Sequence, residues 1–183
     1  MSNLKTFIIG GVHPPEQKLS ATAAIRPLPL SKQLIIPLGQ NLGAPPRVIV
    51  KKGDEVKTGQ LIAQADSFIS ANLHSPASGK IAKIDEAVDA SGFRRPAIFI
   101  DVTGDEWVDD VDTSPEIVRG FSFSKSEIVS RIKAAGLVGL GGATFPTHVK
   151  MMVPDGKKAT HLIINGVECE PYLTSDHRLM LER

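Results

Sequence analysis

Between residues 31 and 103 the chain consists of short runs of apolar and β-branched residues separated by turns that contain glycine. Runs of this length, bounded by glycine, proline and aspartate, are typical of β-strands. The rhythm of these runs predicts a small all-β unit and limits the fold of the chain more than any other feature. The predicted strands are Leu34–Leu38, Val48–Val50, Gln60–Ala65, Lys80–Ile84 and Ala97–Val102.

The β unit has two matching halves. Val48–Ala63 predicts a strand, a tight turn, an exposed connection and a second strand, with Gly53 and Gly59 where a positive φ is needed. His74–Ile84 supplies the matching half. Together they resemble the biotinyl/lipoyl carrier fold, a barrel-sandwich hybrid. Carriers attach their prosthetic group to a lysine in the hairpin between the halves, whereas the hairpin Asp66–Asn72 has no lysine. We therefore expect an unmodified structural or docking module.

The pattern changes on both sides of this unit. Prolines and small residues at the amino end predict an extended segment that lies along the surface of something else. After an acidic stretch, the pattern becomes helix, glycine loop, helix and buried strand, which is typical of α/β domains. The predicted parts are an extended segment 1–30, a β module 31–103, an acidic connector 104–120 and an incomplete α/β domain 121–183.

Composition excludes several classes of protein. The chain has 21 basic and 20 acidic side chains without a block of like charge, so we expect no nucleic-acid partner. Its apolar runs are too short to cross a bilayer, and it lacks the pattern of a secretory signal, so we expect a cytoplasmic protein that meets a membrane only through a partner. The single cysteine, Cys169, can form neither an internal disulfide nor a complete zinc or iron–sulfur site.

A helix is predicted to begin after Ser124. Ser124 and Glu127 have the spacing of a capping box, and Ile128 and Ile132 fall on one face of the helix that follows. Gly136 offers the left-handed residue that ends a helix.

A glycine loop follows that helix. Residues 139–147 contain three glycines and then Pro146, which suits the first turn of a second helix. Without side chains, such a loop lets a phosphate approach backbone N–H groups. Its spacing matches neither the Walker nor the usual dinucleotide pattern, and most glycine-rich loops are simple turns, so the loop alone favours a turn over a phosphate site.

A second polar segment follows the run Ala159–Ile164, which predicts a buried parallel strand. At its carboxyl end the sequence places Asn165–Pro171, which includes Glu168 and Glu170. Open α/β sheets bind ligands at this end of their strands. The alternative is that Asn165-Gly166 is a turn and both glutamates are solvated.

The order of these motifs resembles a known family of flavoproteins. The segment Gly136–Lys150, followed by Asn165–Tyr172 and Asp176, is similar to the flavin- and NADH-binding core of the flavoprotein subunit of respiratory complex I. Within that superfamily, Gly10–Glu16 and Pro37–Pro45 ahead of a carrier-like module point to the C subunit of the Rnf electron-transport complex. The resemblance spans essentially the whole chain and implies a mixed fold. A barrel-sandwich hybrid of the biotinyl/lipoyl type precedes the start of a Rossmann-like α/β domain that binds FMN and NADH.

The resemblance also implies site residues. Lys150 would bring positive charge to the flavin, Asn165 would hydrogen-bond the flavin, and Glu168 and Glu170 would lie near the isoalloxazine or the nicotinamide. The floor under the FMN phosphate and the dinucleotide would be formed by Gly139, Gly141, Gly142 and Ala143.

This sequence departs from the complex I pattern at two positions. Leu140 and Val167 stand where arginine and aspartate are usual, so the polar contacts of those residues are missing. No residue is assigned as catalytic, and His13 and His148 are left out because the flavin carries the redox chemistry.

The function implied is that of an NADH-oxidising, FMN-containing peripheral subunit of the ion-translocating Rnf complex, at the cytoplasmic face of the membrane. Its partners would be NADH and the other subunits, and electrons would pass to 4Fe–4S clusters that lie beyond this chain. Two alternatives remain, a non-catalytic docking fragment and the A subunit of a sodium-translocating NADH–quinone reductase. Because one predicted strand does not complete a sheet, we expect a fragment that binds flavin weakly and does not oxidise NADH alone.

Overall fold

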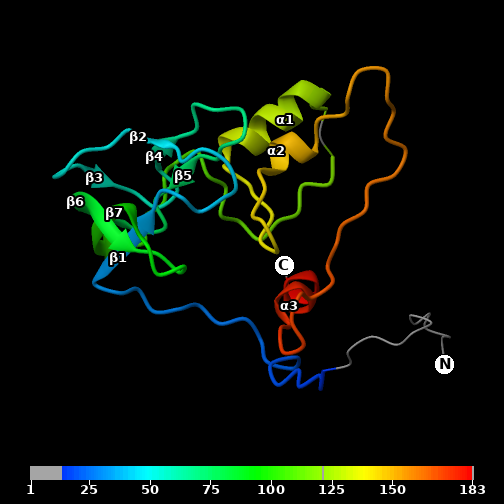
Figure 1. Ribbon diagram of the computed structural model, residues 1–183, viewed down its shortest axis with the longest axis horizontal. Coiled ribbons are helices and arrows are strands. Elements are labelled where there is room, and N and C mark those ends of the chain that lie inside the picture. The colour runs from blue at the N-terminus through cyan, green and yellow to red at the C-terminus, as the bar shows by residue number, and fades with distance from the viewer. Residues whose placement is uncertain (1–13, 121, 183) are drawn as a thin grey trace. The chain divides into compact units, whose positions relative to one another are not determined.

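The computed structural model describes residues 14–120 and 122–182. The chain divides into two compact units, which are described separately (Figure 1). The larger unit comprises the described residues between 29 and 159, and the smaller one combines residues 14–28 with 160–182. Gly10, Gly11 and His13 of the amino-terminal motif lie outside the described residues.

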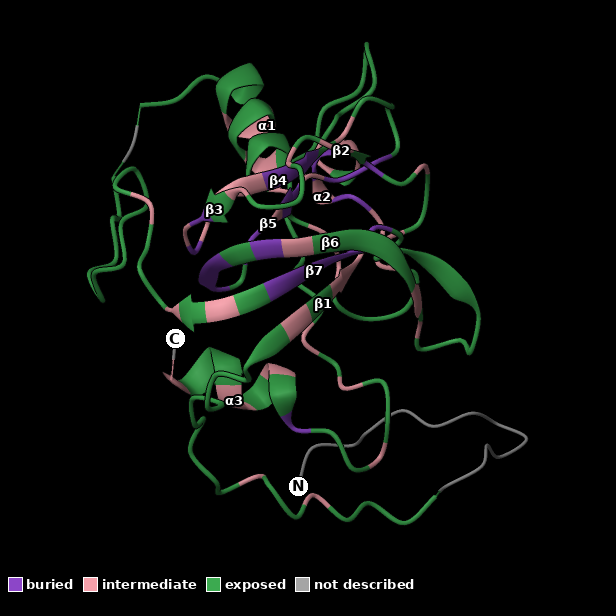
Figure 2. Ribbon diagram, turned by 90° about the vertical axis from the view of Figure 1, so that its left-hand side faces the viewer, coloured by how far each residue is buried: buried purple, intermediate pink, exposed green. Residues whose placement is uncertain are grey.

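Two antiparallel sheets form the β module of the larger unit. Figure 2 shows that its long strands curve over most of their length. The four-stranded sheet has the order β1 (Gln33–Pro37), β7 (Arg94–Gly104), β6 (Ser78–Val88) and β3 (Glu55–Val56). The three-stranded sheet has the order β2 (Arg47–Val48), β4 (Leu61–Gln64) and β5 (Leu73–His74). This is the barrel-sandwich arrangement that the paired halves of the sequence predict.

The core of the module joins both sheets. Ile62 from β4 belongs to one cluster with Ile81 from β6 and with Ile98 and Ile100 from β7, and all four are fully buried. Each such side chain contributes about 1.5–3 kcal/mol on burial, so this cluster is the main attraction between the sheets. Register shifts occur in β6 before Gly79 and near Ile81, where bulges increase the bend of the strand.

The five predicted strands are all present within a few residues of their expected bounds. The sequence did not reveal β3 and β5, because two residues are too few to show an alternating pattern. Gly53 and Gly59 have φ values of 95° and 83°, as predicted.

Residues 105–108 of the acidic connector lie against the β module. Thr58 N–H donates to Glu106 O at 2.8 Å, and Thr58 Oγ1 donates to the Asp105 carboxylate at the same distance. Val108 N–H donates back to Thr58 O at 3.0 Å. The boundary predicted within the connector stays a prediction, because the two compact units group the segments differently.

The larger unit also contains α1 (Lys125–Ala134), which begins at the predicted capping box. Ser124 N–H donates to the Glu127 carboxylate at 2.7 Å, and Glu127 N–H donates to Ser124 Oγ at 3.3 Å. The Ser124 hydroxyl, and then its N–H, hydrogen-bond the carboxylate and lower the pKa of Glu127. Gly136, at φ +66°, follows the helix as predicted.

The second helix of this unit, α2 (Thr147–Lys150), is a single turn. Pro146 precedes the helix as its N-cap, one residue before the first-turn position that the sequence suggested. Pro146 and His148 are both buried, so this short helix is anchored in the larger unit.

In the smaller unit the predicted buried strand is wrong. Residues 160–164 have no strand pairing, and Leu162, Ile163 and Ile164 are 71%, 86% and 77% exposed. A strand needs neighbours to satisfy its N–H and C=O groups. No other described segment pairs with this one.

The smaller unit is built around α3 (Ser175–Glu182), whose start at Thr174–Asp176 was predicted. The amino-terminal segment is bonded to the turn before this helix. Lys18 Nζ donates to Leu173 O at 2.7 Å, and the hydroxyls of Ser20 and Thr174 lie 2.7 Å apart. In residues 14–120 and 122–182, no helix is both long and apolar enough to cross a membrane.

Candidate functional site

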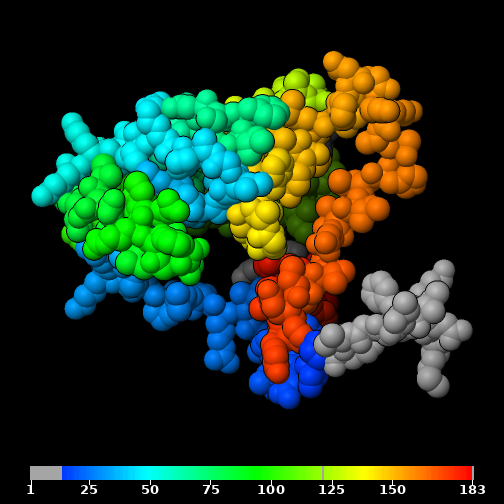
Figure 3. All heavy atoms as spheres, viewed as in Figure 1, coloured from blue at the N-terminus to red at the C-terminus, as the bar shows by residue number. Residues whose placement is uncertain are grey.

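The glycine loop of the larger unit is closed by a short neck. Val138 and Pro146 form an antiparallel bridge, and Gly139 N–H donates to Phe145 O at 3.0 Å. Residues 140–144 form the tip between these pairs. The loop therefore has a fixed base and a tip of small residues, and Figure 3 shows the yellow segment that contains it at the surface.

The tip offers hydrogen-bond donors. Within the described part of the chain, the backbone N–H groups of residues 140–144 donate to no acceptor. Gly142 and Thr144 have φ values of +60° and +49°, and Thr144 is the one described residue other than glycine with a positive φ. Left-handed residues turn successive amides into a concave group that suits an anion.

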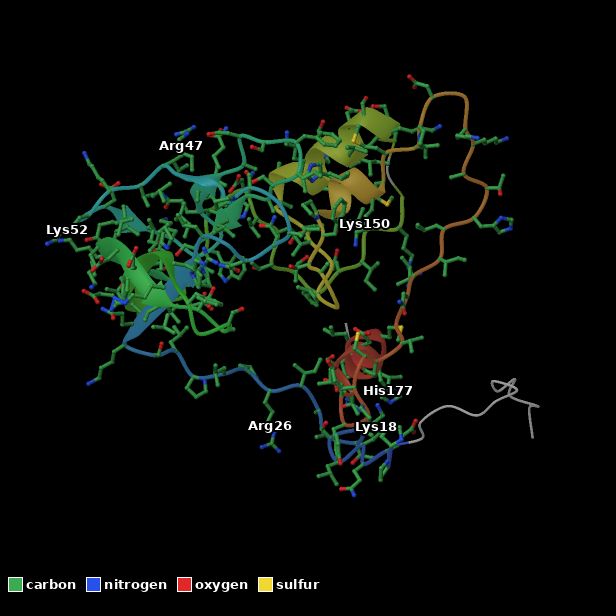
Figure 4. All side chains as sticks on the ribbon, viewed as in Figure 1. Lys18, Arg26, Arg47, Lys52, Lys150 and His177 are labelled. Carbon is green, nitrogen blue, oxygen red and sulfur yellow. The ribbon has the colours of Figure 1, made fainter. Side chains whose placement is uncertain are left out.

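A positive charge lies against the neck. A Cβ built on Gly139 would be 2.9 Å from Lys150 Nζ, so the lysine of α2 reaches the neck of the loop; Figure 4 labels this lysine. The missing side chain at Gly139 is what allows this approach. An ammonium group beside unpaired amides forms a suitable site for a phosphate group.

The other predicted site residues belong to the smaller unit. Asn165 Oδ1 accepts the Val167 N–H at 3.0 Å, which is a local turn. The Glu168 carboxylate accepts the His177 N–H at 3.1 Å and the Ser175 hydroxyl at 3.3 Å, so it caps the first turn of α3. The side chain of Glu170 is exposed.

The structure thus brings one part of the predicted site together within one unit, and this part consists of Gly139, Gly141, Gly142, Ala143 and Lys150. Asn165, Glu168 and Glu170 share the other unit, and their role beside a flavin ring stays a prediction.

Two residues that the sequence analysis did not assign to the site make contacts at the helices on either side of the loop. Asn72 donates to the carbonyl of Ala134 at the end of α1, and His148 of α2 has its Nε2 3.2 Å from Phe68 O. The only signal in the sequence was Gly136, which indicated a helix end but not the close neighbour.

Two family models match the chain. The RnfC barrel sandwich hybrid domain matches residues 6–105, which is more than half of the sequence. The chain belongs to the RnfC family. The Nuo51 FMN-binding domain matches residues 132–183, a range that includes the glycine loop, Lys150 and the acidic segment.

Curated relatives extend this similarity over almost the whole chain. The C subunit of the proton-translocating ferredoxin:NAD(+) oxidoreductase complex of Clostridium ljungdahlii is 46% identical over 98% of this chain and 39% of its own length. The Na(+)-translocating counterpart of Acetobacterium woodii is 42% identical over 93% of this chain and 38% of its own. The C subunit of the ion-translocating oxidoreductase complex of Rhodobacter capsulatus is 43% identical over 98% and 35%. The chain therefore spans less than two fifths of the length of these RnfC relatives.

Proposed function

We propose that this RnfC chain is part of an NADH-oxidising, FMN-containing subunit of an ion-translocating electron-transport complex, and that its glycine loop holds the FMN phosphate. The observation that supports this most directly is the set of unpaired amides at residues 140–144 beside Lys150. This set lies inside the segment that matches an FMN-binding domain.

The geometry suits the phosphate end of FMN. A phosphate monoester carries a charge of about −1.5 to −2 at pH 7 and three strong acceptor oxygens. The loop offers several N–H donors, and Lys150 offers a positive charge. The flavin would supply the redox chemistry, while the protein residues bind and orient it.

The ring end of the site is the second part of the proposal. Asn165 would hydrogen-bond the flavin, and Glu170, which is exposed, would face the isoalloxazine or the nicotinamide. Because Glu168 already accepts two bonds at the start of α3, its contribution would be to hold the segment in shape. The names of the relatives, ferredoxin:NAD(+) oxidoreductases, support a nicotinamide nucleotide as a redox partner. NADH is proposed as the electron donor because the segment resembles the NADH-oxidising subunit of respiratory complex I.

The proposed partners are the other subunits of the complex, and the proposed location is the cytoplasmic face of the membrane, where the subunit would be peripheral. Electrons would pass to 4Fe–4S clusters bound outside these 183 residues, since Cys169 is the single cysteine of the sequence.

The test is to titrate FMN and riboflavin into the chain and follow flavin fluorescence. Riboflavin lacks the phosphate, so FMN should bind more tightly, and Lys150→Met should weaken FMN by roughly fivefold while leaving riboflavin unchanged. Gly141→Val should abolish FMN retention. The matched control is Lys157→Met, an exposed lysine of the same unit. Equal affinity for FMN and riboflavin would refute the phosphate site.

A second candidate function is a docking module without catalysis. It is favoured by the lysine-free hairpin Asp66–Asn72, whose Asn72 is bonded to α1. Adding NADH to the chain with excess FMN tests for an oxidoreductase directly. Bleaching of the flavin absorbance would refute the docking function and would contradict the expectation that this chain does not oxidise NADH alone. Because ordering half a pocket costs binding free energy, we expect FMN to bind this chain weakly. Submicromolar affinity would contradict that expectation.

A further inference from the structure

The hairpin at the position where a carrier has its attachment site contacts the chain on both sides of the glycine loop. This hairpin, residues 66–72, joins β4 to β5. The loop follows α1 and precedes α2, so each end of the loop leads directly into a helix. One contact of the hairpin is made to each of these helices.

The first contact is made by Asn72. Its Oδ1 accepts the Ala65 N–H at 2.9 Å, and its Nδ2 donates to the Ala134 carbonyl at 3.0 Å, the last residue of α1. Gly136 lies directly against the same residue, because a Cβ built on it would be 2.3 Å from Asn72 O. The carboxyl end of α1 is thus fixed by one side-chain bond and one close backbone contact.

The second contact is made by His148 of α2. This histidine is 4% exposed, and its Nε2 lies within hydrogen-bond distance, 3.2 Å, of Phe68 O. The hairpin is itself held in the module, since Ala44 N–H donates to Ile69 O at 2.9 Å. Ser70, between the two contacts, is fully buried.

These contacts leave the loop little freedom of its own. Its tip begins six residues after Ala134 and ends four residues before His148, and the bridge between Val138 and Pro146 closes the neck. A loop held at both stems presents its amides in one arrangement. Binding an anion then requires less ordering than it would in a free loop.

We propose that the hairpin 66–72 supports the phosphate-binding loop, and that Asn72 and His148 are positioning residues for FMN. This inference rests on the proposed function. The lysine-free hairpin would affect the affinity for the phosphate of FMN, through α1 and α2. It would not affect the binding of the flavin ring.

The test uses Asn72→Asp in the 183-residue chain. Aspartate keeps the acceptor for the Ala65 N–H, loses the donor to Ala134 and sets a negative charge beside the carbonyl end of α1. The matched control is Asn41→Asp, which makes the same change in the same module, where Asn41 Nδ2 donates only to Leu42 O among the described residues.

The readout is the ratio of FMN affinity to riboflavin affinity, from flavin fluorescence. We expect Asn72→Asp to weaken FMN by roughly tenfold, which is the loss of one hydrogen bond plus an added repulsion, and to change riboflavin by less than about twofold. Asn41→Asp should change neither. If Asn72→Asp does not fold by circular dichroism, His148→Gln and His148→Ala replace it. Glutamine keeps an amide donor for Phe68 O and should retain the ratio, whereas alanine should lose it.

The outcomes separate the two proposals. A wild-type chain that does not prefer FMN to riboflavin refutes the phosphate-binding loop, and with it the proposed support of that loop by the hairpin. If the wild-type chain prefers FMN and both Asn72→Asp and His148→Ala keep that preference, only the supporting role of the hairpin is refuted. An equal loss of FMN and riboflavin also overturns it, because that result indicates general loosening of the fold.

Discussion

Gly136→Ala isolates the close contact between α1 and the hairpin. Gly136 has a φ of +66°, and a Cβ there would be 2.3 Å from Asn72 O, well under the 3.0 Å that real Cβ atoms keep. Asn72 O is a backbone atom, so it cannot rotate away from an added Cβ. The hairpin and the end of α1 must therefore separate. Separation also breaks the bond from Asn72 Nδ2 to Ala134 O.

The expected cost has two parts. A left-handed φ costs an alanine about 1 kcal/mol, and overpacking with the loss of the Asn72 bond adds roughly 1–3 kcal/mol. Gly92→Ala is the matched control, since Gly92 has a φ of +82° and a Cβ there would have nothing within 4 Å. The control should therefore cost only the first part.

Urea unfolding measures the loss of unfolding free energy for both Gly136→Ala and Gly92→Ala. The ellipticity at 222 nm follows the helices, and the fluorescence of Trp107, the single tryptophan, follows the β module that it contacts through Thr58. We expect Gly136→Ala to lower the unfolding free energy by about 2–4 kcal/mol and to shift the helix signal more than the Trp107 signal. Equal losses for Gly136→Ala and Gly92→Ala would show that the close contact contributes nothing.

Three other substitutions test separate features. Ser70 Oγ is buried and has no hydrogen-bond partner among the described residues, so Ser70→Ala should stabilise the chain by about 1 kcal/mol in urea unfolding, and a loss of stability would indicate a bound water. Burial lowers the pKa of His74 below its ordinary value of 6.5, so the unfolded state binds that proton more readily and stability should decline as the pH falls from about 7.5 to 5.5. His74→Gln should flatten this decline, whereas the carboxylates with lowered pKa values, such as Asp85, titrate below it. Lys18→Met removes the hydrogen bond to Leu173 O and should cost about 1 kcal/mol. Amide hydrogen exchange in α3 should become roughly fivefold faster, whereas Arg26→Met, in the same segment, should leave it unchanged.

The fold could be predicted where the signal is local. The capping box at Ser124 and Glu127 is formed within four residues, and the structure has both of its bonds. The positive φ of Gly53 and Gly59 follows from turns of the same short range. The prediction of a strand at 159–164 was wrong because an apolar run indicates that a segment can be buried but does not indicate which strands would cover it.

The candidate site was predictable only in part for the same reason. The glycine run shows that side chains are absent at 139, 141 and 142, which is sufficient to predict open amides. The contact between Asn72 and Ala134 joins residues 62 positions apart and has no pattern in either segment. The capping role of Glu168 was likewise hidden, because its partner at His177 is nine residues away, beyond the reach of a capping box.

The lysine-free hairpin and the buried contacts near α1 and α2 have one explanation. A carrier hairpin must stay exposed so that its prosthetic group can move. Here residues 66–69 are exposed, whereas Ser70 and Ala71 are 0% and 3% exposed. A lysine at either position would begin at a buried backbone site, and burying an unpaired ammonium group costs several kcal/mol. The buried residues 70 and 71 of the hairpin are therefore unsuited to carry an attachment lysine. In this chain the hairpin contacts Ala134 and His148, and these contacts connect the barrel-sandwich module directly to the helices on either side of the proposed phosphate loop.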